Sequence, residues 1–285
     1  MPAKLIDGKK IAQYYRDSIS EEVQLLRQEG LVPGLAVILV GKDSASQTYV
    51  RMKRKTCQEM GIHSVLIEYG EEVSENELLE KIQQLNGDKT IHGILVQLPL
   101  PKGIQTEKVL EQISPGKDVD GFHPVNIGRM MIGEDSFLPC TPYGIMKMLQ
   151  YEEISPSGKH AVVIGRSNIV GKPAGQLLLR ENATVTYCHS KTEDLASHTR
   201  SADILISAAG RPNFIHGKDI KPGAVVIDVG MNRDERGKLC GDIDFDSAKE
   251  KAGYITPVPG GVGPMTITML MFNTVKSARH VFSKK

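Results

Sequence analysis

The sequence predicts an α/β protein with two domains, each built around a mostly parallel β-sheet. Its 285 residues correspond to about two domains of ordinary length. Short apolar segments with the character of buried strands alternate with segments of helical periodicity in both halves of the chain. A stretch rich in Gly and Pro, residues 114–142, separates the two halves. Strands that alternate with helices indicate parallel sheets, because each helix returns the chain to the same edge of its sheet.

The first half begins with a segment whose apolar residues recur every three or four positions, as they do on one face of a helix. Ser74 and Glu77 form the pattern of a capping box, which predicts the start of another helix. Continuous apolar runs predict buried strands. The expected helices cover residues 11–28 and 44–60 and continue after Ser74, and the expected strands cover residues 35–40, 63–68 and 93–101, the last broken by prolines.

The second half repeats this alternation after a helix, residues 142–151, that is expected to bridge the two halves. Residues 114–142 are expected to be mostly loop, and a long loop in a compact domain is usually functional or disordered. Further strands are expected at residues 160–165, 184–188, 203–206, 224–228 and 254–256, and further helices at residues 171–181 and 263–282, the last with Pro264 in its first turn.

The charge balance and the apolar pattern exclude several classes of protein. Lys and Arg number 35 and Asp and Glu number 34, which gives a net charge of +1 and no general field for nucleic acid or an anionic membrane. No apolar stretch approaches the ~18 residues that a membrane-spanning helix needs. The first residues lack the apolar core and cleavage site of a secretory signal, so a cytoplasmic protein is expected.

The cysteines and histidines indicate neither disulfides nor a metal site. Cys57, Cys140, Cys188 and Cys240 are widely separated and include no C-x-x-C pair. This spacing is typical of reduced thiols in a cytosolic protein. The eight histidines form neither H-x-x-x-H nor H-E-x-x-H. No bound metal is therefore predicted.

A glycine-rich turn follows the first expected strand of the second half. It runs from Gly165 through Gly171 to Gly175, between a strand and a helix, which is the order of a dinucleotide-binding unit. Its glycines are spaced more widely than in G-x-G-x-x-G, so an ordinary glycine-rich turn remains the alternative. The strands and helices that follow favour the nucleotide site.

Charge indicates which dinucleotide this turn would bind. An NAD site usually places Asp or Glu about 20 residues after the first glycine, where the carboxylate binds the ribose 2′-hydroxyl. Here residues 187–191 contain no carboxylate, and the next one is Glu193. Arg166, Ser190 and Lys191 offer charged and hydroxyl donors for a 2′-phosphate instead, which predicts NADP. The alternative is that Arg166 and Lys191 are solvated loop residues.

Two residues of an expected helix in the first half are candidates for proton transfer. Tyr49 and Lys53 lie four positions apart and therefore share a helix face. A lysine with its ordinary pKa of about 10.4 is a poor base near neutrality. Burial and neighbouring cations would lower that pKa, and Lys53 could then take a proton from water or return one. The alternative is that Lys53 belongs to a solvated basic face with Arg51, Arg54 and Lys55.

Three other polar or glycine-rich positions are candidates for ligand binding. Gln97 follows an expected strand at the edge where ligands gather, and it could bind a lysine without adding negative charge, although it could also merely meet solvent. Asp120 precedes Gly121, which is typical of a turn, but its carboxylate could also accept two N–H donors from a flat heterocycle. The glycines of residues 259–264 favour close approach to a ligand or a connector into the last helix.

Five segments that contain these candidates occur in a characteristic order. Together they closely resemble the bifunctional methylenetetrahydrofolate dehydrogenase/methenyltetrahydrofolate cyclohydrolase family, over nearly the whole chain. The segments are YVRMK at residues 49–53, VQLPLP at 96–101, KDVDG at 117–121, GRSNIVGKP at 165–173 and PGGVGPMT at 259–266.

The resemblance implies two domains that face each other across a cleft. Residues 1–141 with 268–285 would form an N-terminal α/β domain that binds folate, to which the last helix returns. Residues 142–267 would form a Rossmann-like, doubly wound parallel-sheet domain that binds NADP. Members of the family usually form homodimers, so a homodimer is implied here.

The resemblance also implies roles for individual residues. Tyr49, Lys53, Gln97 and Asp120 correspond to the catalytic positions, and Asp120 would hold the pterin ring. Met231 replaces the isoleucine of the usual G-I-N-R segment and preserves an apolar contact. The folate contacts would be Tyr49, Lys53, Gln97, Leu98, Asp120, Pro259, Gly260 and Gly263, and the cofactor contacts Gly165, Arg166, Ser167, Ser190 and Met231.

The implied activity is oxidation of 5,10-methylenetetrahydrofolate with NADP⁺, followed by hydrolysis of 5,10-methenyltetrahydrofolate to 10-formyltetrahydrofolate. Hydride transfer needs alignment of the reactants, whereas hydrolysis needs proton transfer, which suits Lys53. One alternative is an enzyme with only one of these activities. Another is a non-catalytic folate- or nucleotide-binding protein on the same scaffold, which the presence of Lys53, Gln97 and Asp120 disfavours.

Overall fold

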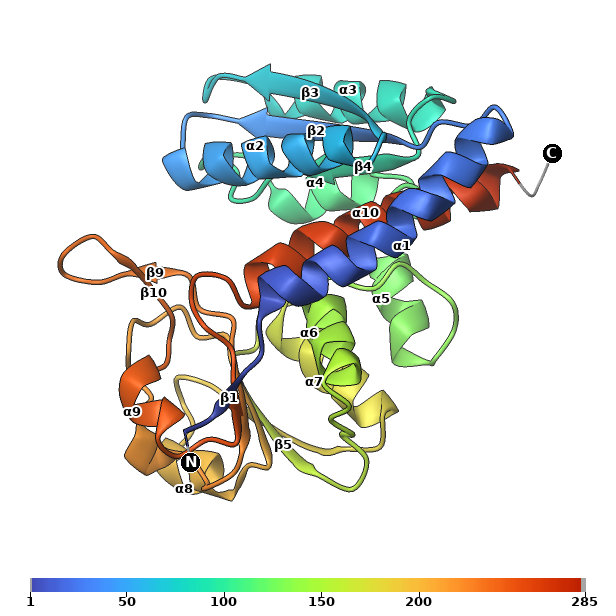
Figure 1. Cartoon of the computed structure of the whole chain (residues 1–285). Helices are drawn as coiled ribbons and strands as arrows, with labels where there is room; N and C mark the ends of the chain where they lie inside the picture. The colour runs from blue at the N-terminus through green and yellow to red at the C-terminus, as the bar shows by residue number, and fades with distance from the viewer. Residues whose placement is uncertain (1, 283–285) are drawn as a thin grey trace. The chain divides into compact units, whose positions relative to one another are not determined.

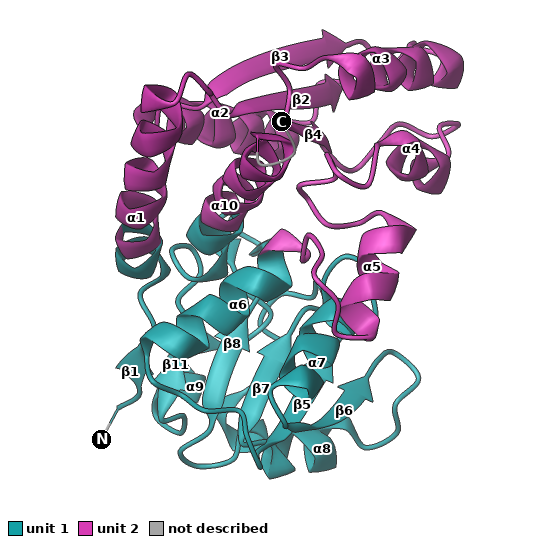
Figure 2. Ribbon diagram, turned by 90° about the vertical axis from the view of Figure 1, so that its right-hand side faces the viewer, with its two compact units in different colours: residues 1–13, 141–266 teal, residues 14–140, 267–285 magenta. Residues whose placement is uncertain are grey.

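The computed structural model describes residues 2–282 and divides into two compact units. Unit 1 consists of residues 1–13 and 141–266, and unit 2 of residues 14–140 and 267–285 (Figure 2). Two long helices, α1 (Gly8–Gln28) and α10 (Val262–Phe282), each contain a boundary between the units (Figure 1). Each of these helices therefore contributes residues to both units. None of the helices in residues 2–282 combines the length and the apolar character of a bilayer-spanning segment.

Unit 2 contains a parallel sheet of three strands in the order β3-β2-β4. The central strand β2 is buried at every residue, as its uninterrupted apolar sequence predicts. Helices connect the strands (Figure 1). The strands are β2 (Gly34–Val40), β3 (His63–Tyr69) and β4 (Gly93–Val96), and the helices are α2 (Ser44–Glu59), α3 (Glu75–Gly87), α4 (Thr106–Gln112) and α5 (Pro124–Met131), with parts of α1 and α10.

The core of unit 2 lies between the sheet and its helices. Ile38 and Ile94 from β2 and β4 are fully buried with Leu78 and Ile82 from α3. The helix α3 begins where the capping pattern predicts, because Ser74 Oγ accepts a hydrogen bond from the backbone N–H of Glu77 at 3.2 Å.

Unit 1 contains a parallel sheet of six strands in the order β1-β11-β8-β7-β5-β6. A short antiparallel hairpin, β9 and β10, stands apart from this sheet. The strands are β1 (Lys4–Leu5), β5 (His160–Ile164), β6 (Thr184–Cys188), β7 (Ile204–Ser207), β8 (Val225–Asp228), β9 (Asn232–Arg233), β10 (Leu239–Cys240) and β11 (Tyr254–Ile255). The helices are α6 (Cys140–Tyr151), α7 (Gly171–Arg180), α8 (Leu195–Ser201), the 3₁₀ turn η1 (Gly217–Asp219) and α9 (Phe245–Lys249), with parts of α1 and α10.

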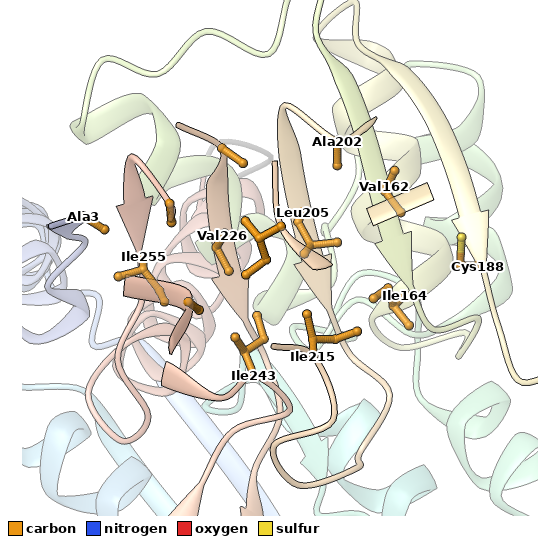
Figure 3. Packing of buried hydrophobic residues seen from close by; sticks show 14 residues of the cluster. Ala3, Val162, Ile164, Cys188, Ala202, Leu205, Ile215, Val226, Ile243 and Ile255 are labelled. Carbon is orange, nitrogen blue, oxygen red and sulfur yellow. The ribbon is translucent and has the colours of Figure 1, made fainter. Parts of the chain in front are cut away.

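The core of unit 1 collects apolar side chains from several neighbouring strands (Figure 3). Val162, Leu205, Val226 and Ile255 come from β5, β7, β8 and β11, and all four are fully buried. The apolar runs of β5, β7 and β8 thus form the centre of the larger sheet.

Both sheets change direction at a central strand. In unit 2 the chain passes from β2 to β3 on one side and then to β4 on the other. In unit 1 it passes from β5 to β6 on one side and then to β7 on the other. Ligands of open α/β sheets bind at the carboxyl ends of the strands at such a switch point.

The N-terminal residues differ from the expected domain division. Residues 1–141 were expected to belong to one domain, but the first 13 cluster with unit 1. The reason is β1, in which Lys4 pairs with Tyr254 and Leu5 with Ile255 at the edge of the larger sheet. A strand of two residues is too short to leave a period in the sequence.

The prediction that residues 114–142 are mostly loop is wrong for α5 (Pro124–Met131). Pro124 occupies the first turn of this helix, where proline needs no N–H partner. His123 caps the helix, since its Nδ1 accepts a hydrogen bond from the backbone N–H of Val125 at 3.1 Å. The Gly and Pro content of a segment does not show that a proline such as Pro124 begins a helix.

Candidate functional site

Lys53 is buried on α2 among basic residues that are exposed. Only 7% of Lys53 is exposed, whereas Arg51, Arg54 and Lys55 all face solvent. Tyr49 lies one turn earlier on the helix and is half-buried. The solvated basic face considered from the sequence therefore exists, but its members are the neighbours of Lys53 and not Lys53 itself.

The Lys53 ammonium group is paired with the side chain of Gln97. Lys53 Nζ donates a hydrogen bond to Gln97 Oε1 at 3.0 Å. Gln97 directly follows β4, and its backbone N–H donates to Ile38 O on the neighbouring strand at 2.8 Å. Its Nε2 donates to Leu98 O at 2.8 Å, which leaves Oε1 for the lysine. Gln97 thus accepts from the ammonium group without a negative charge, as the sequence suggested.

Burial dominates the electrostatics of this lysine. It lowers the pKa of Lys53, because an ammonium group loses its hydration in a site of low dielectric constant. The expected contribution of neighbouring cations is wrong, since the charged group that acts most strongly on Lys53 is Asp120, which raises its pKa. Burial is also the larger effect on Asp120 and raises its pKa to about 6, although the positive charge of Lys53 acts in the opposite direction. Lys53 and Asp120 therefore influence each other's protonation.

The turn that carries Asp120 is held by a different aspartate. Asp118 Oδ1 accepts a hydrogen bond from Phe122 N at 3.1 Å, and Oδ2 accepts from His123 N and from Asn126 Nδ2, both at 2.8 Å. The turn chemistry considered for Asp120 is thus provided by Asp118, which is buried. The carboxyl group of Asp120 instead interacts with the positive charge of Lys53.

Asn273 and Cys140, which the sequence does not identify as site residues, also hold the turn that carries Asp120. Asn273 Nδ2 on α10 donates to Val119 O at 2.9 Å and to Leu138 O at 3.1 Å. The Cys140 thiol donates to Val119 O at 3.3 Å, and burial raises the pKa of Cys140 well above its usual value. The only sequence signal for Asn273 is a polar amide in an apolar helical run, residues 267–275.

In unit 1, the glycine-rich turn lies at the switch point after β5. Gly165 has φ +128°, and a Cβ there would lie 2.4 Å from Ala208 O. A Cβ on Gly171 would lie 2.3 Å from Gly165 O, so the turn folds back tightly on itself. Ser167 Oγ accepts hydrogen bonds from the N–H groups of Val170 and Gly171 at 3.2 Å, at the start of α7. The turn is therefore built as a compact entry into a helix N-terminus, which favours anions.

The remaining predicted cofactor residues follow three strands of the same parallel sheet. Arg166 follows β5, Ser190 follows β6 and Met231 follows β8, and all three are exposed. Lys191, beside Ser190, is exposed as well. The phosphate groups of a dinucleotide need accessible hydrogen-bond donors. Here such donors are the guanidinium of Arg166, the hydroxyl groups of Ser167 and Ser190, and the N-terminus of α7. These residues therefore fit a dinucleotide. Met231 offers apolar surface.

Pro259, Gly260 and Gly263 belong to unit 1, whereas Lys53 and Asp120 belong to unit 2. Gly260 has φ +104°, a conformation that favours glycine. A Cβ on Gly8 would lie 1.7 Å from Gly261 O, so this segment packs closely against the start of α1. Its role as a connector is therefore evident, and its predicted folate contact stays a prediction.

A doubly wound sheet with a glycine-rich turn at its switch point, in one chain with a buried lysine whose pKa is lowered by burial, is typical of a two-domain enzyme that uses a dinucleotide. Two family models refine this class. The model "Tetrahydrofolate dehydrogenase/cyclohydrolase, catalytic domain" matches residues 6–120, and "Tetrahydrofolate dehydrogenase/cyclohydrolase, NAD(P)-binding domain" matches residues 139–282.

Individual relatives agree with the models over the full length. The protein named Bifunctional protein FolD from Bacillus subtilis is 60% identical over 283 residues, which are 99% of this chain and 100% of the relative. The crystal structure of the bifunctional enzyme FolD from Campylobacter jejuni is 51% identical, with a TM-score of 0.96 and coverage of 98% of this chain and 99% of that one. A Trypanosoma brucei FolD structure, complexed with NADP cofactor and inhibitor, is 41% identical, with a TM-score of 0.95 and 99% coverage of both chains.

The chain belongs to the tetrahydrofolate dehydrogenase/cyclohydrolase family. The predictions of this family, of its two-domain α/β fold, of the two folate activities and of a nicotinamide dinucleotide cofactor are therefore confirmed.

Proposed function

We propose that the chain oxidises 5,10-methylenetetrahydrofolate with NADP⁺ and hydrolyses the resulting 5,10-methenyltetrahydrofolate to 10-formyltetrahydrofolate, with Lys53 as the group that transfers protons in the hydrolysis. The hydrogen bond between the buried Lys53 and the half-buried Gln97 carries this proposal. A binding protein would have no need for a lysine whose pKa is lowered by burial, because a solvated ammonium group binds anions at lower desolvation cost.

The chemistry of the hydrolysis defines what Lys53 has to do. A water oxygen forms a bond to the methenyl carbon and loses a proton. The bond from that carbon to N5 then breaks, N5 takes up a proton, and the remaining hydroxyl proton is released to solvent, so that the carbon stays on N10 as a formyl group. Neutral Lys53 accepts the first proton, and the ammonium group then returns it. Gln97 orients Nζ for both steps by its hydrogen bond.

Asp120 and Tyr49 supply binding rather than proton transfer. The carboxylate of Asp120 accepts N–H donors of the pterin ring, and the hydrogen bonds of Asp118 keep the turn in place for this. Tyr49 flanks the ring system from α2, and Leu98 continues the contact beside Gln97. Pro259, Gly260 and Gly263 are proposed to approach the folate through their backbone.

The cofactor is proposed to be NADP, bound by Gly165, Arg166, Ser167, Ser190 and Met231. When bound, its nicotinamide accepts the hydride from the one-carbon bridge. Arg166 and Ser190 provide donors for the 2′-phosphate, and the α7 N-terminus provides N–H groups for the pyrophosphate. The trypanosomal structure with NADP supports this choice.

The proposed setting is the cytoplasm, and the proposed assembly is a homodimer. The four cysteines are free thiols in the structure, which suits a reducing compartment. The small net charge of +1 supports a small-molecule substrate rather than a nucleic acid.

One experiment separates the proposed function from its alternatives. The protein is mixed with 5,10-methylenetetrahydrofolate and NADP⁺, and the absorbance of NADPH and of the methenyl product is followed. Formation of NADPH with transient methenyl product is expected. Accumulating methenyl product would indicate a dehydrogenase alone. Hydrolysis of added methenyltetrahydrofolate without NADPH formation would indicate a cyclohydrolase alone, and neither reaction would indicate a binding protein.

A further inference from the structure

A second buried aspartate gathers hydrogen-bond donors from two loops of unit 1. Asp242 is fully buried. Its Oδ2 accepts from Ser207 Oγ at 2.9 Å, from Ala209 N at 2.7 Å and from Gly210 N at 3.3 Å. Its Oδ1 accepts from Arg211 N at 3.0 Å and from Asn232 Nδ2 at 2.9 Å. A single carboxylate thus satisfies five donors.

These donors lie at the carboxyl edge of the sheet, beside the cofactor turn. Ser207 ends β7 and begins the loop of residues 207–211, whereas Asn232 follows β8 next to Met231. Ala208 N donates to Ile164 O at 2.7 Å, directly before the cofactor turn. The carbonyl of Ala208 is also the atom that a Cβ on Gly165 would meet at 2.4 Å. The loop fixed by Asp242 therefore packs directly against the turn.

Asp242 is itself held by the other buried carboxylate of this unit. Asp228 accepts from Asp242 N at 3.0 Å and from Ile243 N at 2.9 Å. A Cβ on Gly241 would lie 1.8 Å from Asp228 Oδ2, and a Cβ on Gly230 would lie 2.3 Å from Asp242 Oδ1. The two glycines thus make room for the carboxylates, and the arrangement depends on both.

We propose, on the basis of the function proposed above, that Asp242 is a positioning residue for the dehydrogenase reaction, which fixes the backbone of residues 208–211 and the Met231–Asn232 segment for the nicotinamide half of the cofactor. Burying a carboxylate requires its donors to replace all of its hydration. A loop that served only to connect two elements could be closed by apolar packing without that demand. The donors come from the loops after β7 and β8, whereas Ser190, proposed to bind the 2′-phosphate, follows β6 on the opposite side of β5. The part of the cofactor served by Asp242 is therefore one that NADP⁺ and NAD⁺ share.

The test is Asp242→Asn, which keeps the shape of the side chain but replaces an accepting oxygen by an N–H₂ group that faces other donors. The kcat/KM for NADP⁺ should fall roughly 10- to 100-fold, the effect of one hydrogen bond to a charged group, mainly through KM. The kcat/KM for NAD⁺ should fall by the same factor. Hydrolysis of added methenyltetrahydrofolate, which needs no cofactor, should stay unchanged.

Asp244→Asn is the matched control, because Asp244 lies two residues away and accepts from His216 and Ser247 at the surface. It should leave both activities unchanged. Ser207→Ala and Asn232→Ala each remove one of the five donors to Asp242. Each should raise the KM for NADP⁺ several-fold, which is less than the roughly tenfold effect expected when a hydrogen bond to a charged group is lost completely. These two variants decide the question if Asp242→Asn does not fold.

Normal use of NADP⁺ by all three variants would overturn the proposal. So would equal loss of the dehydrogenase and cyclohydrolase reactions in folded Asp242→Asn, which would assign Asp242 to general stability. A wild-type protein that forms no NADPH would instead refute the proposed function, and the two failures are therefore distinguishable.

Discussion

At the carboxyl end of β2 in unit 2, the candidate side chains are buried or half-buried and interact with one another, whereas at the carboxyl end of β5 in unit 1 the polar candidate side chains are exposed. Lys53, Gln97 and Asp120 interact within their own unit. Arg166 and Ser190 extend into solvent. The same arrangement, a parallel sheet whose chain changes direction at a central strand, thus supports two kinds of site. A lysine that transfers protons needs a dry environment that lowers its pKa, whereas phosphate binding needs accessible charged donors.

Asp120 of unit 2 differs in a related way from the two buried aspartates of unit 1, Asp228 and Asp242. Burial raises the pKa of both Asp120 and Asp228 to about 6. Asp228 accepts three backbone N–H groups and Asp242 accepts five donors, so both are saturated by the protein. Asp120 is instead balanced by the charge of Lys53. A carboxylate whose oxygens already accept several hydrogen bonds from the protein holds loops together. A carboxylate that is balanced by a single cation can still accept hydrogen bonds from a ligand.

The largest expected effect is that of Lys53→Met, which removes the buried ammonium group from unit 2. Hydrolysis of methenyltetrahydrofolate should fall about 10²–10⁴-fold, the usual contribution of general acid–base catalysis, while folate still binds. The same change at the exposed Lys55, which pairs with Glu59, should have no effect on hydrolysis. Wild-type hydrolysis by the Lys53 variant would show that the buried pair is structural.

Arg166→Ala tests the exposed site of unit 1. It should lower kcat/KM for NADP⁺ roughly 10- to 1,000-fold, the value of one or two charged hydrogen bonds, and barely change kcat/KM for NAD⁺, which lacks the 2′-phosphate. Added salt should reduce the preference of the wild-type protein for NADP⁺ over NAD⁺, because ions screen an exposed phosphate site. Lys159→Ala is the control, since Lys159 is exposed at the opposite, amino end of β5. Equal loss of both cofactors would place Arg166 at the pyrophosphate or in the turn.

Asp120→Ala should weaken folate binding by about 10- to 100-fold, because hydrogen bonds to a charged acceptor are lost. Both activities should fall, and NADP⁺ affinity should stay the same. Calorimetry with folate and with NADP⁺ measures the two affinities separately. Unchanged folate affinity would make Asp120 part of the turn, like Asp118.

The smallest expected effect is a pH dependence of folate binding. The carboxylate form of Asp120 binds the N–H donors, and its pKa is about 6 in the folded protein. Folate affinity should therefore be constant above that pH and fall as the pH decreases through it, approaching about tenfold per pH unit. The Asp120→Asn variant should lack this transition. A wild-type affinity that rises on acidification would contradict the assignment.

The sequence predicts the parts of the fold that rest on long apolar runs. β2 and β5 were expected because each is a continuous apolar segment, and the neighbouring glycine-rich turn marks the switch point of unit 1. β1 was not expected, because its two residues acquire their structure only by pairing with β11. The helix α5 was missed because Pro124 was interpreted without its place in the first turn.

The candidate site shows a similar division. The spacing of Tyr49 and Lys53 predicts a shared face, but it does not distinguish buried Lys53 from exposed Arg51. That distinction depends on which side of α2 packs on the sheet. Asp242 left no sequence signal, because most of its donors are backbone N–H groups of residues 209–211, which any amino acid except proline supplies.

The division of the chain has a consequence for its synthesis on the ribosome. Domains usually fold in the order in which they emerge, but unit 2 combines residues 14–140 with residues 267–285. Asn273 on α10 holds Val119 O and Leu138 O, and Ser277 Oγ donates to Gly116 O at 2.8 Å. The turn that carries Asp120 therefore lacks this part of its support until residues 273–277 have left the ribosomal tunnel. A chain that stopped before Asn273 would lack these hydrogen bonds, so the turn acquires its full set of contacts late in translation.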